Sequence, residues 1–220
     1  MTWWFYDLSK FLLWLFYRLG FGLEVVGCEH VPRRGAFIVA SNHVSYLDPP
    51  LVGVACPRRL RFMARADLYD HGLLGAFLRG VRVIPLKRGA GDVAAVRAAL
   101  DALRRGAGVA IFPEGGRQFS GELGVAKRGV GFLADAARAP VIPVLVRGTF
   151  QALPPGARRL GRAKIRVAFG EAITYTDTPA PRRHEEVAEA VSQAWRRLAQ
   201  QMTEPSSSIR KDSGCFHDHG

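Results

Sequence analysis

The chain has 220 residues, 48% of them hydrophobic, a composition that excludes a polypeptide too small or too polar to bury a core and favours one main domain. Its 31 lysines and arginines against 19 acidic residues give a formal net charge of +12. Such a charge predicts anionic partners, among them acidic lipid headgroups, phosphorylated small molecules, an acidic carrier protein or nucleic acid.

The segment 1–23 is dense in Trp, Phe, Leu and Tyr and forms the first predicted helix. Its longest uncharged stretch, residues 11–17, is much shorter than the roughly 18 to 20 residues that a bilayer-spanning helix requires. On a helical wheel Asp7, Lys10 and Arg18 share one narrow sector, and nearly all of the remaining circumference is apolar. We therefore expect a helix that lies in the membrane interface, the alternative being a helix that covers the core of its own domain.

The β-type run Ala36–Ala40 is followed closely by His43 and Asp48. A turn after a buried strand would expose a histidine that can act as a general base and a carboxylate that can orient it. The spacing alone leaves other interpretations open: Asp48 precedes two prolines, as a helix N-cap residue does, and His43 could be an ordinary loop histidine. Residues five apart lie about 140° from each other on a helix, so the pair can meet only if the chain turns.

From residue 24 to residue 203, short β-type runs alternate with helical patterns. This alternation predicts a single α/β domain with a mixed, largely parallel sheet flanked by helices. The predicted strands are Ala36–Ala40, Arg61–Ala64, Arg82–Leu86, Val109–Phe112, Val141–Val146 and Ile165–Phe169, and the predicted helices are Asp92–Arg105, Val130–Ala137 and Glu185–Met202.

A second polar loop follows the predicted strand Val109–Phe112. Glu114 and Arg117 lie three residues apart in it, and Gly115 allows the backbone to approach a ligand closely. Ligands bind to α/β sheets outside the carboxyl ends of the strands, so this loop and the His43 loop converge if their strands are parallel neighbours. The alternative for Glu114 and Arg117 is an ordinary surface ion pair.

Two further cations are candidate phosphate ligands. Lys127 stands at the start of a predicted helix, where the helix N-terminus adds positive potential of the kind that holds phosphate. Arg88 follows another predicted strand, and it is either a phosphate ligand or a solvated cation.

Taken in order, these motifs resemble those of the glycerolipid acyltransferases of the 1-acyl-sn-glycerol-3-phosphate acyltransferase type. The resemblance covers residues 24–175 and rests on four blocks of sequence. These blocks are Asn42-His43-Val44-Ser45-Tyr46-Leu47-Asp48, Val83-Ile84-Pro85-Leu86-Lys87-Arg88, Phe112-Pro113-Glu114-Gly115-Gly116-Arg117 and Val141-Ile142-Pro143-Val144.

The resemblance implies transfer of a fatty acyl group from a thioester to the free hydroxyl of lysophosphatidic acid, which gives phosphatidic acid. His43 would be the general base and Asp48 would orient its imidazole. Arg88 and Arg117 would bind the acceptor phosphate, with Glu114 orienting Arg117. Backbone N–H groups near Gly115 are candidate donors to the oxyanion. The donor would be acyl-CoA or acyl carrier protein, and neither a cofactor nor a metal is expected.

Three positions depart from the family pattern. Gly116 stands where the family usually has Thr, Gln118 where it often has Ser, and Lys87 where an acidic residue often precedes the arginine. These changes leave the catalytic pair intact and leave the acceptor open, with glycerol 3-phosphate and a lyso-aminolipid as alternatives.

Two other classes of function compete with this interpretation. A non-catalytic basic protein could bind membrane or nucleic acid, although the chain has no recognised nucleic-acid motif, so nucleic acid is not an expected partner. A serine hydrolase could use Ser45, although no Gly-x-Ser-x-Gly motif is present. The expected location is the cytoplasmic face of the cell membrane, as a peripheral or monotopic protein.

The last segment, residues 204–220, is predicted to be a disordered tail. Within it Cys215, His217 and His219 superficially resemble a metal-binding tract, but such polar tails are common and no metal site is expected. Cys28, Cys56 and Cys215 are isolated in sequence and odd in number, which argues against a disulfide framework and fits a reducing cytosolic setting.

Overall fold

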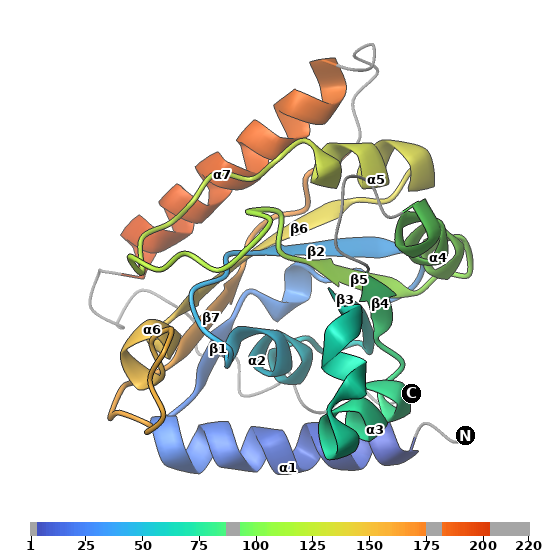
Figure 1. The fold of residues 1–220 in the computed structure, drawn as a ribbon. Helices are drawn as coiled ribbons and strands as arrows, with labels where there is room; N and C mark the ends of the chain where they lie inside the picture. Colours follow the sequence, from blue (N-terminus) through green and yellow to red (C-terminus); the bar gives the residue numbers. More distant parts are fainter. Residues whose placement is uncertain (1–3, 87–92, 175–181, 203–220) are drawn as a thin grey trace.

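The computed structural model describes residues 4–86, 93–174 and 182–202, and these form one seven-stranded sheet with helices on both faces (Figure 1). Neighbouring strands pair in parallel except β6 and β7, which are antiparallel, so the predicted mixed and largely parallel sheet is confirmed. The strands, in their order across the sheet, are β1 (Glu24–Val26), β7 (Arg166–Phe169), β6 (Val141–Arg147), β2 (Phe37–Ser41), β5 (Gly108–Ile111), β3 (Leu60–Arg65) and β4 (Ile84–Leu86).

The central strand β2 is buried along its whole length. Its sequence is a continuous apolar run rich in β-branched residues, which is typical of a parallel strand covered on both faces. β2 lies between β5 and β6 and pairs in parallel with both of them. The sequence that follows β2 therefore leaves the middle of the sheet at its carboxyl edge.

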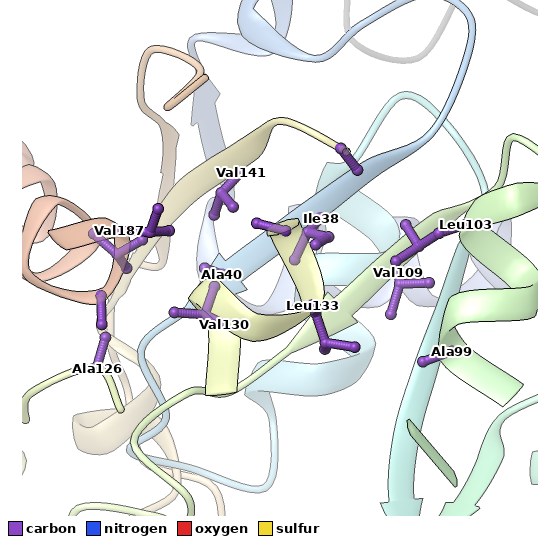
Figure 2. Packing of buried hydrophobic residues seen from close by; sticks show 14 of the residues in the cluster. Ile38, Ala40, Ala99, Leu103, Val109, Ala126, Val130, Leu133, Val141 and Val187 are labelled. Atoms are coloured by element: carbon purple, nitrogen blue, oxygen red, sulfur yellow. The ribbon is translucent and has the colours of Figure 1, made fainter. Parts of the chain in front are cut away.

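One face of the sheet is covered by α4 (Val93–Arg104), α5 (Gly129–Ala137) and α7 (Arg182–Gln201). Figure 2 shows side chains of this core, with Ile38 and Val109 from the sheet near Leu133 and Leu103 from the helices. These helices correspond to the three that the sequence predicts, although the predicted cap Asp92 lies outside the described residues.

The opposite face carries α2 (Asp48–Ala55) and α6 (Thr149–Ala152), and α1 (Trp4–Phe21) lies across α2 as an outer layer (Figure 1). α3 (Gly72–Gly80) packs beside the beginning of α1, where the rings of Phe5 and Phe77 are 6.2 Å apart. Two short 3-10 helices, η1 (Cys28–His30) and η2 (Ala66–Asp70), complete the elements of the described residues.

α1 turns polar side chains toward the protein. Asp7 pairs with Arg59, and the Lys10 side chain is only 7% exposed. Along the described part of the chain, no helix is both long and apolar enough to cross a bilayer. The outward side of α1 carries exposed large apolar residues, namely Trp4, Leu8, Phe11, Leu12, Leu15, Phe16 and Leu19.

The cysteines differ from the prediction at one position. Cys56 is a buried free cysteine, whereas Cys28 is disulfide-bonded, so the expectation of isolated thiols is wrong for Cys28. Three cysteines leave room for one disulfide, so an odd count could not exclude it. The predicted tail, with its candidate metal tract Cys215, His217 and His219, lies outside the described residues.

Candidate active site

The two polar loops meet at the carboxyl edge of the sheet, because β2 and β5 are parallel neighbours. The His43 N–H donates to Glu114 Oε2 at 2.8 Å, and the Gln118 N–H donates to the His43 carbonyl at 2.8 Å. The loops were predicted to converge if their strands were parallel neighbours, and both the pairing and the convergence are present in the structure.

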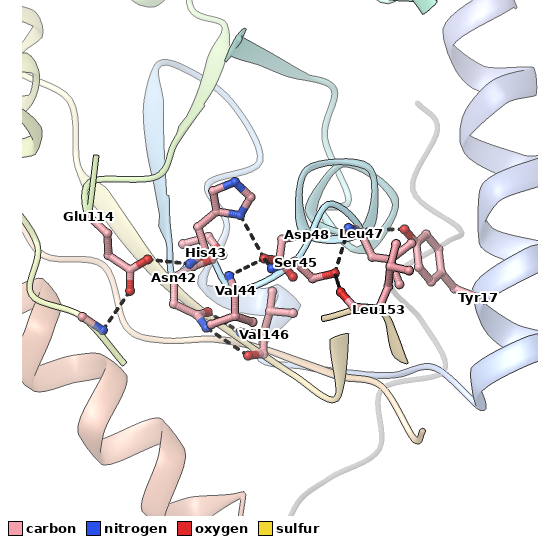
Figure 3. Close-up of polar contacts among 12 residues, drawn as sticks. Tyr17, Asn42, His43, Val44, Ser45, Leu47, Asp48, Glu114, Val146 and Leu153 are labelled. Atoms are coloured by element: carbon pink, nitrogen blue, oxygen red, sulfur yellow. Dashed lines mark hydrogen bonds and ion pairs between the residues drawn. The ribbon is translucent and has the colours of Figure 1, made fainter. Parts of the chain in front are cut away.

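His43 and Asp48 form a hydrogen-bonded pair across a turn, with Nδ1 and Oδ2 2.9 Å apart (Figure 3). Asp48 is fully buried, whereas the His43 side chain keeps 16% exposure. Because an ionised carboxylate can only accept, the proton of this hydrogen bond belongs to His43 Nδ1. The Nε2 atom is then left with a free lone pair, which is the state that a general base requires.

The same carboxylate oxygen shapes the turn that carries His43. The N–H groups of Val44 and Ser45 each donate to Asp48 Oδ2 at 2.7 Å. The N-cap residue of α2 is Leu47, and no described side chain caps this end of the helix, so the alternative in which Asp48 caps it is wrong. Asp48 is itself the first helical residue, and its carboxylate points back to the preceding turn.

Phe112, the first residue after strand β5, packs on His43. Its ring centroid lies 4.4 Å from that of His43, with the planes 31° apart. This contact restrains the imidazole plane from the side of the second loop. No role was predicted for Phe112 from the sequence, although it begins the block Phe112–Arg117.

Asn42 and Ser45 bond to backbone groups rather than to the imidazole. Asn42 exchanges two hydrogen bonds with the backbone of Val146, at 2.8 and 3.1 Å, and so fixes the end of β2 to β6. The Ser45 hydroxyl donates to the Leu153 carbonyl at 2.7 Å. Both residues shape the turn, and the use of Ser45 as a hydrolase nucleophile does not fit this arrangement.

Glu114 joins the two loops instead of pairing with Arg117. Its side chain is 4% exposed, and its oxygens accept from the N–H groups of His43 and, at 3.0 Å, Gly124. Burial raises the pKa of Glu114, and the two backbone hydrogen bonds offset part of that rise. Glu114 is buried, and among the described residues Arg117 bonds to Tyr46 rather than to this carboxylate, so the predicted surface ion pair and the predicted orienting contact with Arg117 are both wrong.

Arg117 lies beside the catalytic turn through Tyr46. Its guanidinium carbon stands 3.5 Å above the Tyr46 ring, and Nη2 donates to the Tyr46 hydroxyl at 2.8 Å. Nη1 is buried without a partner among the described residues, so the guanidinium has a spare donor for an anion. Tyr46 was missed by the sequence analysis, although it is a 61% exposed aromatic residue inside the His43 to Asp48 frame.

Gly115 and Lys127 bring further positive charge to the second loop. Gly115 has φ +79°, a conformation that favours glycine, and the position of an added Cβ would lie 2.7 Å from Lys127 Nζ, so the ammonium lies close over the loop. The uncapped N-terminus of α5 begins two residues after Lys127. The Gly115 N–H donates to the Phe112 carbonyl at 3.1 Å, which makes it a poorer candidate for the oxyanion. Arg88 lies outside the described residues.

A histidine hydrogen-bonded to a buried carboxylate, beside a loop with spare cationic donors, is an arrangement that can support general-base chemistry on an anionic ligand. A model of the family described as Acyltransferase matches residues 22–147. Because this match covers more than half of the chain, the chain belongs to the acyltransferase family.

Individual relatives agree with this assignment. The 1-acyl-sn-glycerol-3-phosphate acyltransferase of Bacillus subtilis (strain 168) is 26% identical over 181 residues, which cover 80% of this chain and 88% of that protein. The 1-acyl-sn-glycerol-3-phosphate acyltransferase alpha of Mus musculus is 34% identical over 185 residues, 79% of this chain. The chain spans only 64% of the length of the mouse protein.

The fold is also shared with a solved structure. The crystal structure of the 1-acyl-sn-glycerophosphate acyltransferase PlsC from Thermotoga maritima has a TM-score of 0.75 to this chain at 24% sequence identity. The similarity covers 91% of this chain and 81% of that one.

Proposed function

We propose that the protein transfers a fatty acyl group from an acyl thioester to the free hydroxyl of 1-acyl-sn-glycerol 3-phosphate, forming phosphatidic acid. The observation that carries this proposal is the His43–Asp48 pair, held at 2.9 Å at the carboxyl edge of an acyltransferase-family sheet. The names of the Bacillus and mouse relatives support the choice of acceptor.

In this proposal His43 Nε2 removes the proton from the acceptor hydroxyl as the oxygen attacks the thioester carbonyl. The imidazolium that forms is stabilised by Asp48 Oδ2 through the existing hydrogen bond. The tetrahedral intermediate then collapses, the carbon–sulfur bond breaks, and the proton passes from His43 to the leaving thiolate. No covalent acyl-enzyme is required.

The acceptor phosphate is proposed to bind at the second loop. Nη1 of Arg117 is buried and has no partner within the described part of the chain, and Lys127 lies exposed over Gly115 next to the N-terminus of α5. These groups supply charge-assisted hydrogen bonds and positive potential for a phosphate monoester. Arg88, which the resemblance assigns to the same phosphate, remains part of the proposal on sequence grounds.

We further propose that the protein works at the cytoplasmic face of the cell membrane, with the apolar side of α1 in the interface. That side carries seven exposed large apolar residues, more than a water-facing helix surface normally shows. A lysophospholipid acceptor lies in the same interface, and acyl-CoA or acyl carrier protein would reach the site from the aqueous side.

The test is an acyl-transfer assay of the purified protein in mixed micelles. Acyl-CoA and acyl carrier protein donors are each offered with lysophosphatidic acid, glycerol 3-phosphate and a lyso-aminolipid. We expect acylation of lysophosphatidic acid to dominate and to disappear in His43→Ala. Turnover of the wild-type protein no faster than that of His43→Ala, with every acceptor, would overturn the proposal.

A further inference from the structure

Helix α1 buries a lysine in the side that faces the protein. Lys10 is 7% exposed, and burial lowers the pKa of its ammonium below 10.5. Burial of a cation costs free energy unless the cation gains partners, whereas an apolar side chain would pack without that cost. The partners that Lys10 gains therefore indicate what the residue does.

Lys10 and a second α1 residue bond to the two ends of α2. Lys10 Nζ donates to the carbonyl of Cys56, the C-cap residue of α2, at 2.7 Å. The Tyr17 hydroxyl donates to the carbonyl of Leu47, the N-cap residue of α2, at 2.9 Å (Figure 3). A cation at the C-terminal end of a helix also interacts favourably with the helix dipole.

The helix held in this way begins with the carboxylate of the dyad. Asp48 is the first residue of α2, no side chain caps this end of the helix, and Asp48 Oδ1 is buried without a partner among the described residues. Within the described residues, the hydrogen bonds of Asp48 to His43 and to the turn all end on Oδ2. A shift of α2 along its axis would therefore move Asp48 relative to His43 directly.

We propose that Lys10 and Tyr17 are positioning residues for acyl transfer, which hold both ends of α2 and thereby fix Asp48 against His43. Helix α1 then serves the reaction with its polar side while its apolar side remains free for the interface. The kinetic part of this inference rests on the proposed function. Its structural part concerns only the hydrogen bond between His43 and Asp48.

The kinetic test uses Lys10→Met and Tyr17→Phe in the full chain, assayed with lysophosphatidic acid in mixed micelles. We expect each variant to lose about tenfold in kcat with acceptor KM unchanged, since a misplacement near 1 Å costs up to about a hundredfold. Lys10→Arg keeps a cationic donor at this position and is expected to recover most of the loss in kcat.

Two matched controls remove similar groups elsewhere. Tyr69→Phe deletes another tyrosine hydroxyl that donates to a backbone carbonyl, that of Val83 at 2.6 Å. Lys164→Met removes a lysine that pairs with Glu24 on the surface. Both controls are expected to keep the wild-type kcat, because the partners of these side chains, Val83 and Glu24, do not belong to α2.

A substrate-free measurement separates this inference from the proposed function. In histidine-labelled protein, the Nδ1–H proton of His43, identified by its loss in His43→Ala, is expected to change its NMR shift in Lys10→Met and Tyr17→Phe. An unchanged shift together with unchanged kcat would overturn the inference, and so would an equal fall in kcat in Tyr69→Phe.

A raised acceptor KM at constant kcat would overturn it too, because Lys10 and Tyr17 would then belong to acceptor binding. If Lys10→Met does not fold, Tyr17→Phe and Lys10→Arg decide.

Discussion

Asp48 has two tasks that substitution can separate. It orients His43, and it accepts hydrogen bonds from two buried backbone N–H groups of the turn. We expect Asp48→Asn and Asp48→Ala both to lose roughly 10²- to 10⁴-fold in kcat, because neither can stabilise the imidazolium. Only Asp48→Ala should also lose about 1–3 kcal/mol of unfolding free energy, since it leaves buried donors without an acceptor. Initial rates and urea unfolding curves measure the two effects, and near-normal turnover of Asp48→Asn would contradict the assignment.

The raised pKa of Glu114 predicts how the unfolding free energy of the protein changes with pH. Burial raises its pKa above its ordinary 4.5 in the folded protein, so the folded state holds this proton more tightly than the unfolded state does. As pH rises from the ordinary pKa to the raised one, the unfolding free energy contributed by this group must fall. The difference in unfolding free energy between wild type and Glu114→Gln, taken in that order, should therefore decrease from acidic to neutral pH. A difference that grows over this range would show that the carboxylate is stabilised in its charged form.

Arg117 is expected to act on the acceptor rather than on the chemical step. Arg117→Ala should raise the acceptor KM by about tenfold to a hundredfold with a smaller change in kcat, because one charge-assisted contact to phosphate is lost. Tyr46→Phe is the matched comparison, since it removes the hydroxyl bonded to Nη2 but keeps the ring under the guanidinium. A fall in kcat at constant KM in Arg117→Ala would move this residue into the chemical step.

The sequence predicted which residues meet at this site better than it predicted their hydrogen-bond partners and ring contacts. Convergence of His43 and Glu114 follows from two apolar strands, each followed by a polar loop, and needs only the rule for parallel sheets. The actual partners of Glu114, two backbone amides, depend on loop conformation, which no periodic pattern in the sequence encodes. The same holds for Tyr46 and Phe112, whose contacts with Arg117 and with the imidazole depend on ring orientation.

At the scale of elements, the strongly periodic or continuously apolar segments were predicted correctly, whereas several short elements were missed. β1 has three residues, Glu24–Val26, too few to show an alternation. α3 contains three glycines in Gly72–Gly80, which lower its helix propensity, and it is stabilised instead by packing against α1 and η2. The helix of residues 1–23 was predicted, but not that its charged side would face the protein.

The apolar side of α1 can be tested separately from its polar side. The double substitution Leu12→Ser and Leu19→Ser is expected to lower the vesicle partition coefficient by at least about tenfold, because each leucine contributes roughly 1.5–3 kcal/mol when it leaves water. Leu160→Ser, at another exposed leucine outside α1, is the control and should bind as the wild type does. The measurement is co-sedimentation with lipid vesicles, and equal binding of all three proteins would exclude α1 as the contact.

On the scale of the whole molecule, two physical forces are expected to bring the protein to a membrane. The net charge of +12 attracts anionic headgroups over a distance set by salt, whereas the apolar side of α1 acts only on contact. The first contribution weakens as the ionic strength rises, and the second does not.

We therefore expect binding to vesicles that contain acidic lipid to fall steeply between low and high salt and then to level off at a residual value. Binding to vesicles of zwitterionic lipid alone should start near this residual value and change little with salt, since it depends on α1. The Leu12→Ser and Leu19→Ser variant should keep the salt-dependent part and lose the residual part. Binding of the wild-type protein that disappears completely at high salt would show that charge alone holds it, and that the exposed apolar side of α1 faces something other than lipid.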